Sequence, residues 1–259
     1  MNNLLEFRSP EVSRGAFLFA PGHVTLTPGR VAVLLGPNGG GKSTALRMAA
    51  GLLPPVCGEV LLGGVPVAAM SARARAGRVS LVVQRPEVGA PLTVLEVVRL
   101  GRVALPPTEG AAERSLARVG LADLADRPYH SLSGGQQQRV SVARALAQHA
   151  AGGVLLLDEA FAAIDPPEAA SLVREIRAEA SRGATVLAAT HDLAVASALA
   201  DDVWCLVDGR TRAFGAAGEV LAPETLSSLL GISVREASGC RGKIAVADFA
   251  AMLSGTEPS

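Results

Sequence analysis

Short apolar runs alternate along this chain with longer segments in which apolar residues recur at helical spacing. The short runs are typical of buried strands, and they occupy residues 31–35 (VAVLL), 79–83 (VSLVV), 153–159 (GVLLLDE), 183–190 (GATVLAAT) and 202–209 (DVWCLVDG). A helix is expected to follow the first of them, over 42–52, with Gly51 near its end. The alternation predicts an α/β domain.

Two regions depart from this alternation. Residues 58–67 (GEVLLGGVPV) predict a hairpin that turns at Gly63 and Gly64, and hence a small antiparallel subdomain. From Arg85 to about Ala150 the pattern is helical, which predicts a second lobe inserted between strands. Its expected helices lie at 93–101, at 109–120 and from Ser133 onward, and a closing helix is expected at 223–231. The tail from about Ser238 is weakly patterned.

Composition narrows the class of protein. The 259 residues include 24 Lys and Arg against 24 Asp and Glu, a balance that leaves no electrostatic footprint for nucleic acid. Cys57, Cys205 and Cys240 fit neither a metal-ligand spacing nor a disulfide framework, so we expect a reducing cytosol. The N-terminus lacks the pattern of a signal peptide, and no apolar run reaches the length of a spanning helix, so we expect a soluble chain.

The first strong motif is a phosphate-binding loop. Gly36-x-x-x-x-Gly41-Lys42-Ser43 follows a predicted strand and precedes a predicted helix, which favours it over a glycine-rich surface turn. Glycines let backbone N–H groups surround a phosphate at a helix N-terminus, Lys42 reaches the phosphate oxygens, and the Ser43 hydroxyl suits Mg²⁺. The predicted nucleotide-binding residues of the loop are Gly36, Pro37, Asn38, Gly39, Gly40, Gly41, Lys42, Ser43 and Thr44.

Two carboxylates end the strand at 153–159. A buried strand that finishes in Asp158 and Glu159 places them where α/β proteins bind ligands. The same local sequence would also fit a strand that ends at a solvated acidic turn. Asp158 is predicted to hold Mg²⁺, and Glu159 to accept a proton from attacking water. Gln84 and His191 also follow predicted strands, but a single polar residue at a strand end is weak evidence of function.

A second glycine-rich stretch, LSGGQQQRV at 132–140, needs its own explanation. Ser133 is a natural N-cap, and Gly134 and Gly135 leave the first N–H groups of the helix open to an anion. Within one chain such a site would compete with the first loop for the same phosphate. We therefore expect it to serve a nucleotide held by a second copy of the protein.

With these motifs in order from about Val24 to Gly231, the chain resembles the ATP-binding cassette (ABC) transporter ATPases. The resemblance implies a P-loop NTPase core with a mixed sheet, a small antiparallel β subdomain and a helical subdomain inserted at about 86–150. It implies an ABC ATPase domain over 1–235, followed by a tail at 236–259. It also implies ATP and Mg²⁺ as cofactors and a head-to-tail dimer that hydrolyses ATP.

The resemblance assigns further residues. Glu159, His191 and Lys42 become the catalytic residues, His191 contacts the γ-phosphate, and Gln84 senses Mg²⁺ and the membrane partner. The implied Mg²⁺ ligands are Ser43, Gln84 and Asp158, and Gln84 and Asp158 join the nucleotide-binding set. The loop that closes over the partner's ATP comprises Leu132, Ser133, Gly134, Gly135 and Gln136, and Asp165 marks the D-loop.

Three positions depart from the family pattern. Ala160 replaces the usual proline after the Walker B glutamate, and AAID at 162–165 replaces Ser-Ala-Leu-Asp while keeping Asp165. The aromatic residue that stacks on adenine should lie near Ser9, where there is none. Phe7 is the first candidate to replace it, ahead of Phe17 and Phe19.

At a finer level, residues 82–102 and 215–234 look like the importer ATPases for iron–siderophore, haem and cobalamin. The implied partners are a second copy of the subunit, integral membrane permease subunits and a substrate-binding protein, but no nucleic acid. The implied location is cytoplasmic, peripheral on the inner face of the cell membrane. Alternatives are zinc, manganese or cobalt import, export, and a soluble ABC ATPase such as one of iron–sulfur assembly. A small-molecule kinase would leave 132–140 unexplained.

Overall fold

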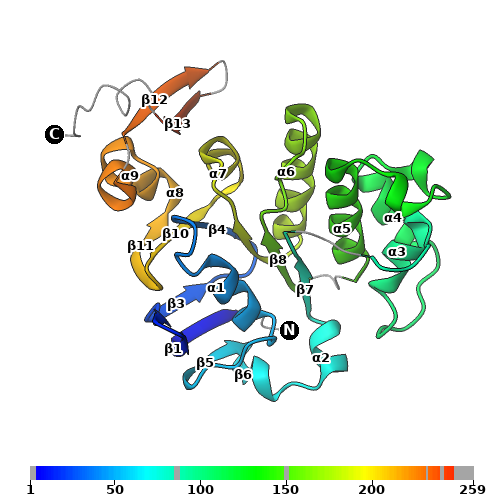
Figure 1. The fold of residues 1–259 in the computed structure, drawn as a ribbon, viewed down its shortest axis with the longest axis horizontal. Helices are drawn as coiled ribbons and strands as arrows, with labels where there is room; N and C mark the ends of the chain where they lie inside the picture. The colour runs from blue at the N-terminus through cyan, green and yellow to red at the C-terminus, as the bar shows by residue number, and fades with distance from the viewer. Residues whose placement is uncertain (1–3, 85–87, 149–151, 232, 240–241, 248–259) are drawn as a thin grey trace.

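The computed structural model describes residues 4–84, 88–148, 152–231, 233–239 and 242–247. A six-stranded sheet ordered β11-β10-β4-β9-β8-β7 forms its centre (Figure 1). The strands from β10 to β7 run parallel, and β11 pairs antiparallel with β10. They are β4 (Val31–Leu35), β7 (Val79–Val82), β8 (Val154–Asp158), β9 (Thr185–Ala189), β10 (Asp202–Val207) and β11 (Arg210–Ala216). The predicted α/β fold with a mixed sheet is confirmed.

Strand β4 shows why the central strands are uniformly apolar. Its residues alternate between two hydrophobic clusters, with Val31, Val33 and Leu35 on one face of the sheet and Ala32 and Leu34 on the other. Helices cover the first face, while helix α1 (Lys42–Ala49) and the N-terminal sheet cover the second. A strand buried on both faces reads as a continuous apolar run rather than as an alternating one.

An antiparallel sheet packs beside α1 and contains the predicted hairpin. Strand β5 (Cys57–Leu62) turns into β6 (Val65–Pro66) through Gly63 and Gly64, both at positive φ. The other strands of this sheet are β1 (Leu5–Arg14), β2 (Phe17–Phe19) and β3 (His23–Leu26). The sequence predicted none of these three. In β1, an irregularity between Arg8 and Glu11 breaks the period of two.

The helical lobe lies at the β7 edge of the central sheet, where Figure 1 shows α3, α4 and α5 together. Thr93 and Glu96 form a reciprocal capping box that begins α3, as the sequence Thr-x-x-Glu favours. The remaining helices are α2 (Ala72–Ala76), α3 (Val94–Leu100), α4 (Ala111–Arg118), α5 (Gly134–Gln148), α6 (Pro166–Ser181), α7 (Leu193–Leu199), α8 (Ala217–Val220) and α9 (Pro223–Leu230). No helix in the described ranges has the length and apolarity to cross a bilayer.

The tail is more ordered than its weak pattern indicates. Strands β12 (Val234–Gly239) and β13 (Gly242–Ala247) form an antiparallel hairpin, which lies against α9 and α7. The predicted boundary between 235 and 236 falls inside β12. The local sequence pattern does not predict this hairpin, which packs against neighbouring elements. Cys240 and residues 248–259 lie outside the described residues.

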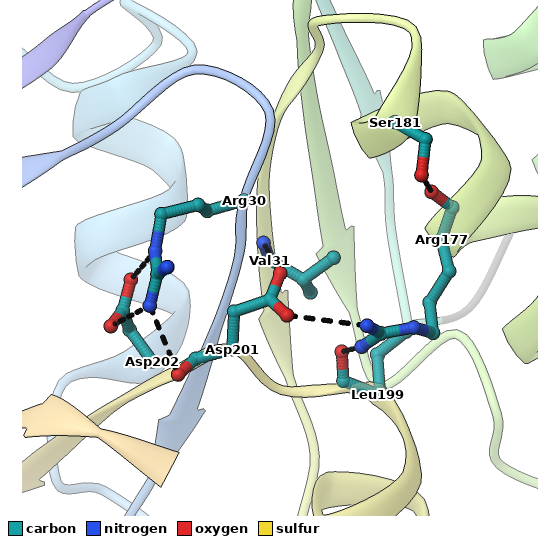
Figure 2. A network of polar contacts seen from close by, with 7 residues as sticks. All are labelled: Arg30, Val31, Arg177, Ser181, Leu199, Asp201 and Asp202. Atoms are coloured by element: carbon teal, nitrogen blue, oxygen red, sulfur yellow. Dashed lines mark hydrogen bonds and ion pairs between the residues drawn. The ribbon is translucent and has the colours of Figure 1, made fainter.

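A polar network fastens the N-terminal ends of β4 and β10 (Figure 2). Asp201 accepts the backbone N–H of Val31 at 2.9 Å and lies 3.2 Å from the Arg177 guanidinium on α6. Arg177 also donates to the carbonyl of Leu199 at the end of α7, and Arg30 pairs with Asp202 at 2.6 Å. This network joins α6, α7 and two strands at the edge opposite the phosphate loop.

Candidate functional site

The phosphate loop links the C-terminal end of β4 to α1, and close packing requires glycine at several of its positions. A Cβ added at Gly36, where φ is +144°, would overlap the carbonyl oxygen of Leu206. A Cβ added at Gly41, where φ is +107°, would lie 2.8 Å from the ring of Phe19. Both positions therefore need glycine for space as well as for backbone conformation.

Lys42 begins α1 and points back into the loop. Its Nζ donates to the carbonyl oxygens of Gly36 at 2.7 Å and Pro37 at 3.1 Å. Burial lowers the pKa of the Lys42 ammonium, while the charges of Glu159 and Asp158 act in the opposite direction. The carboxylates thus favour the protonated form that a phosphate contact needs.

One open cavity of about 470 Å³ brings together many of the residues that the sequence singled out, but Gly36, Pro37, Gly40, Asp165 and His191 are not among those that line it. It is lined by Phe17, Asn38, Gly39, Gly41, Lys42, Ser43, Thr44, Gln84, Asp158 and Glu159. The strand order explains this meeting, because β7, β8 and β4 end at the same edge of the sheet and carry Gln84, the carboxylates and the loop. Side chains from distant parts of the sequence therefore share one pocket.

Ser43 and Asp158 form the part of the cavity suited to a divalent cation. The Ser43 hydroxyl donates to Asp158 Oδ1 at 3.1 Å, so two oxygen ligands already lie together. Gln84 lines the same cavity and offers an amide oxygen. An all-oxygen set fits the preference of Mg²⁺ for hard ligands.

Glu159 lies directly after β8 and contacts His191. Its backbone has φ of +52°, and its N–H donates to the carbonyl of Ala189 at 3.1 Å, which fixes the peptide beside β9. His191 Nδ1 lies 2.9 Å from Glu159 Oε2. The side chain of Glu159 is 9% exposed and that of His191 71%, so the histidine reaches from the surface to a nearly buried carboxylate.

The stretch at 132–136 is not part of the phosphate cavity. None of these described residues is among those that line the cavity. Ser133 accepts the backbone N–H of Gln136 at 3.3 Å, and the Gln136 side chain accepts that of Ser133 at 3.0 Å, a reciprocal cap for α5. Ser133 and Gly134 are exposed, as is Asp165 before α6.

The expectation that Phe7 replaces the missing aromatic is wrong. Phe7 is fully buried, and its ring meets that of Trp204 edge-on with centroids 4.9 Å apart. Phe19 is fully buried too, whereas the partly buried Phe17 lines the cavity. Spacing along the sequence pointed to Ser9 because it could not account for the pairing of β2 with β1, which carries Phe17 to the loop.

A family model described as ABC transporter matches residues 20–162. The chain belongs to this family, and it is an ATPase of the kind that forms the ATP-binding subunit of such transporters.

Two groups of relatives refine the comparison. The chain is 39% identical over 241 residues to the hemin import ATP-binding protein HmuV of Bordetella pertussis, covering 88% of this chain and 92% of that protein. It is 39% identical over 211 residues to the cobalamin import ATP-binding protein BtuD of Halobacterium salinarum, covering 79% of this chain and 52% of that one. Among solved structures, a chain described as a metal-chelate type ABC transporter, inward-facing, aligns with a TM-score of 0.79 at 25% identity, covering 97% of this chain and all of that one.

Proposed function

We propose that this ATPase works as a head-to-tail dimer and drives import of a metal chelate (iron–siderophore, haem or cobalamin) through separate membrane permease subunits. The observation that carries the proposal is the cavity that joins the phosphate loop, Gln84, Asp158 and Glu159 while excluding residues 132–136 of the same chain. A second anion-binding loop that lies outside the ATP pocket of its own chain can act on the ATP that a second copy binds.

Each residue in the cavity has a role in this proposal. The loop from Gly36 to Thr44 surrounds the phosphates, with Lys42 exchanging its carbonyl partners for phosphate oxygens. Ser43, Asp158 and Gln84 hold Mg²⁺, which supplies charge neutralisation at the phosphates. Phe17 lies beside Gly41 and offers a ring to the base.

Glu159 is the proposed general base. As a carboxylate it can only accept hydrogen bonds, so His191 donates from Nδ1, and this contact orients the carboxylate. The proton of the attacking water then moves to Glu159, as its place at the edge of the phosphate cavity allows. His191 itself is exposed enough to meet the γ-phosphate at the dimer interface.

The dimer follows from the position of the cap on α5. Ser133 and Gly134 are exposed, so the start of α5 can close over a phosphate presented by the partner. We propose that Leu132, Ser133, Gly134, Gly135 and Gln136 act in this way and that Asp165 lies at the same interface. We also propose that the ABC ATPase domain spans 1–235, with the helical subdomain inserted at about 86–150. The tail then begins at residue 236.

The relatives support the cargo. HmuV and BtuD are named for the import of hemin and cobalamin. Hemin and cobalamin are both large metal chelates. We extend this cargo class to the present chain and place it on the cytoplasmic face of the membrane, with a substrate-binding protein as a further partner. The exposed Leu100 and Val103 at the end of α3, 47% and 79% accessible, offer apolar contacts to a permease.

Reconstitution tests the proposal most directly. The subunit, assembled in liposomes with the permease that co-purifies with it, should couple ATP hydrolysis to uptake of haem, a ferric siderophore or cobalamin. Leu100→Asp with Val103→Asp should weaken co-purification while the free subunit still binds ATP, and Leu52→Asp, at another exposed apolar position, is the matched control. Uptake of free Zn²⁺, Mn²⁺ or Co²⁺ without any chelate would assign another cargo class, and outward transport would reverse the direction.

A further inference from the structure

The two-residue turn between β10 and β11 contacts the phosphate loop, although neither of its residues lines the cavity. Asp208 and Gly209 have φ of +49° and +73°, as a hairpin turn of this length favours. The N–H of Gly209 donates to the carbonyl of Gly40 at 3.0 Å. The carbonyl oxygen of Leu206, on β10, would overlap a Cβ at Gly36 and would lie 2.8 Å from one at Gly40. The end of this hairpin is therefore in close contact with the phosphate loop.

The same turn holds strand β2, which begins with Phe17. The carbonyl of Gly209 accepts the N–H of Ala20, directly after β2, at 2.8 Å. A Cβ built at Gly209 would overlap the carbonyl oxygen of Leu18, within β2. Gly209 therefore bonds the phosphate loop through its N–H and the end of β2 through its carbonyl, and it has no room for a side chain.

Strand β11 makes a second bond to the segment after β2. The Thr211 hydroxyl donates to the carbonyl of Pro21 at 2.6 Å and accepts the Nε1–H of the buried Trp204 at 2.8 Å. Strand β2 also touches the phosphate loop directly, since a Cβ at Gly41 would lie 3.4 Å from Cζ of Phe17. The hairpin of β10 and β11 thus fixes two elements that meet at the cavity.

Of these two elements, β2 is the less firmly held. It has three residues, and its strand partner in the described ranges is β1. In the phosphate loop, Lys42 donates to the carbonyls of Gly36 and Pro37, and the N–H of Gly40 donates to Pro37 as well. A side chain at position 209 would therefore displace β2 rather than the loop, and would move Phe17 with it.

We infer that Gly209 is a positioning residue for nucleotide recognition. Because it lacks a side chain, β2 lies close to the phosphate loop, and this sets the spacing between the Phe17 ring and the glycines of the loop. The inference rests on the proposed role of Phe17 in stacking on the base. A nucleotide needs its base and its phosphates held at one separation, whereas a bare polyphosphate needs only the loop. A turn outside the cavity then determines how well the base is held.

Binding of ATP and of inorganic tripolyphosphate, measured by calorimetry, tests the inference. Gly209→Ala should raise the Kd for ATP about 5–150-fold, the loss of stacking on one ring, and should change the Kd for tripolyphosphate little. Gly209→Asn should have the same effect with a smaller loss of stability, because Asn tolerates positive φ but still carries a Cβ. Gly64→Ala is the matched control. Gly64 is also the second residue of a two-residue hairpin turn, with φ of +80°, but nothing lies within 4 Å of its Cβ.

A double-mutant cycle with Phe17→Ala gives the sharpest result. In that background Gly209→Ala should weaken ATP binding little further, because the displaced ring is already absent. Full addition of the two effects, an equal loss of tripolyphosphate affinity, or an unchanged Kd for ATP in both Gly209 variants would overturn the inference alone. An unchanged Kd in Phe17→Ala itself would overturn the proposed stacking and the inference with it. Thermal unfolding of every variant, measured in parallel, separates weaker binding from a lower folded fraction.

Discussion

His191 Nδ1 lies 2.9 Å from Glu159 Oε2, and the two residues come from the ends of neighbouring parallel strands, β9 and β8. The histidine follows one strand and the glutamate the other, so the sheet itself sets their separation. The contact therefore depends on the pairing of β8 with β9. It makes Glu159 the first residue to test.

Glu159→Gln should abolish turnover while ATP binding persists, because an amide keeps the shape of the carboxylate and cannot accept the proton. The loss of general-base catalysis is expected to be about 10²–10⁴-fold in kcat. The variant with ATP should elute as a dimer in size-exclusion chromatography, and its ADP form as a monomer. Adding Ser133→Arg should return it to a monomer that still binds ATP. Glu59→Gln on β5, an exposed position, should behave like the unaltered protein.

Lys42→Ala should weaken ATP binding by removing a charge-assisted hydrogen bond, at a cost of about 1.5–3 kcal/mol. Titration calorimetry with ATP and with AMP separates this effect from general damage, since AMP lacks the β- and γ-phosphates that the ammonium contacts. AMP affinity should change little. Arg47→Ala, on the exposed side of the same helix, serves as the control. Equal losses for both nucleotides would contradict the assigned contact.

Replacing Phe17 and Phe7 by alanine should affect different properties, the KM for ATP in the first case and the stability of the fold in the second. Phe17→Ala should raise the KM for ATP, since base stacking is worth about 1–3 kcal/mol, while the melting temperature stays nearly constant. Phe7→Ala should instead lower stability by about 3–5 kcal/mol, because the ring is fully buried against Trp204. Comparing ATP with GTP shows how far Phe17 selects the base, and we expect modest discrimination. An unchanged KM in Phe17→Ala would show that Phe17 does not stack on the base.

Asp201→Ala should destabilise the fold without altering the active site. It leaves the Val31 N–H and the Arg177 guanidinium without their shared acceptor, which costs about 1–3 kcal/mol. The melting temperature should fall by roughly 2–12 °C for a chain of this size, while the KM for ATP is unchanged. Asp123→Ala, at an exposed position, is the control. A changed KM would mean that the network at the far end of β4 reaches the nucleotide site.

The sequence predicted best where function and local physics impose the same pattern. Strand β4 is buried on both faces, the glycines of the loop after it permit the turn, and α1 begins at Lys42 as expected. It predicted least where partners distant in the chain decide the structure. Strand β1 alternates irregularly because of its bulge, and the tail hairpin depends on α7 and α9.

The candidate site shows the same division. Local motifs named the phosphate loop and the two carboxylates, and β7 placed Gln84 beside them without any motif of its own. The choice between Phe7 and Phe17 required knowledge of strand pairing, which one-dimensional spacing does not contain. A Cβ built at Gly135 would overlap the carbonyl oxygen of Ala163, and this close approach is also invisible in the sequence because the two positions lie 28 apart.

The central position of β4 has a consequence for synthesis on the ribosome. Its two neighbours, β9 and β10, are encoded about 150 residues later, so VAVLL emerges long before either partner exists. At translation rates of about 5–20 residues per second, this apolar strand waits roughly 8–30 seconds without its sheet. An exposed run of β-branched and aliphatic residues is prone to aggregate, so the nascent chain should depend on chaperone binding during that interval. Slower translation of residues 36–184 would lengthen the exposure and lower the soluble yield, even though the finished protein would be identical.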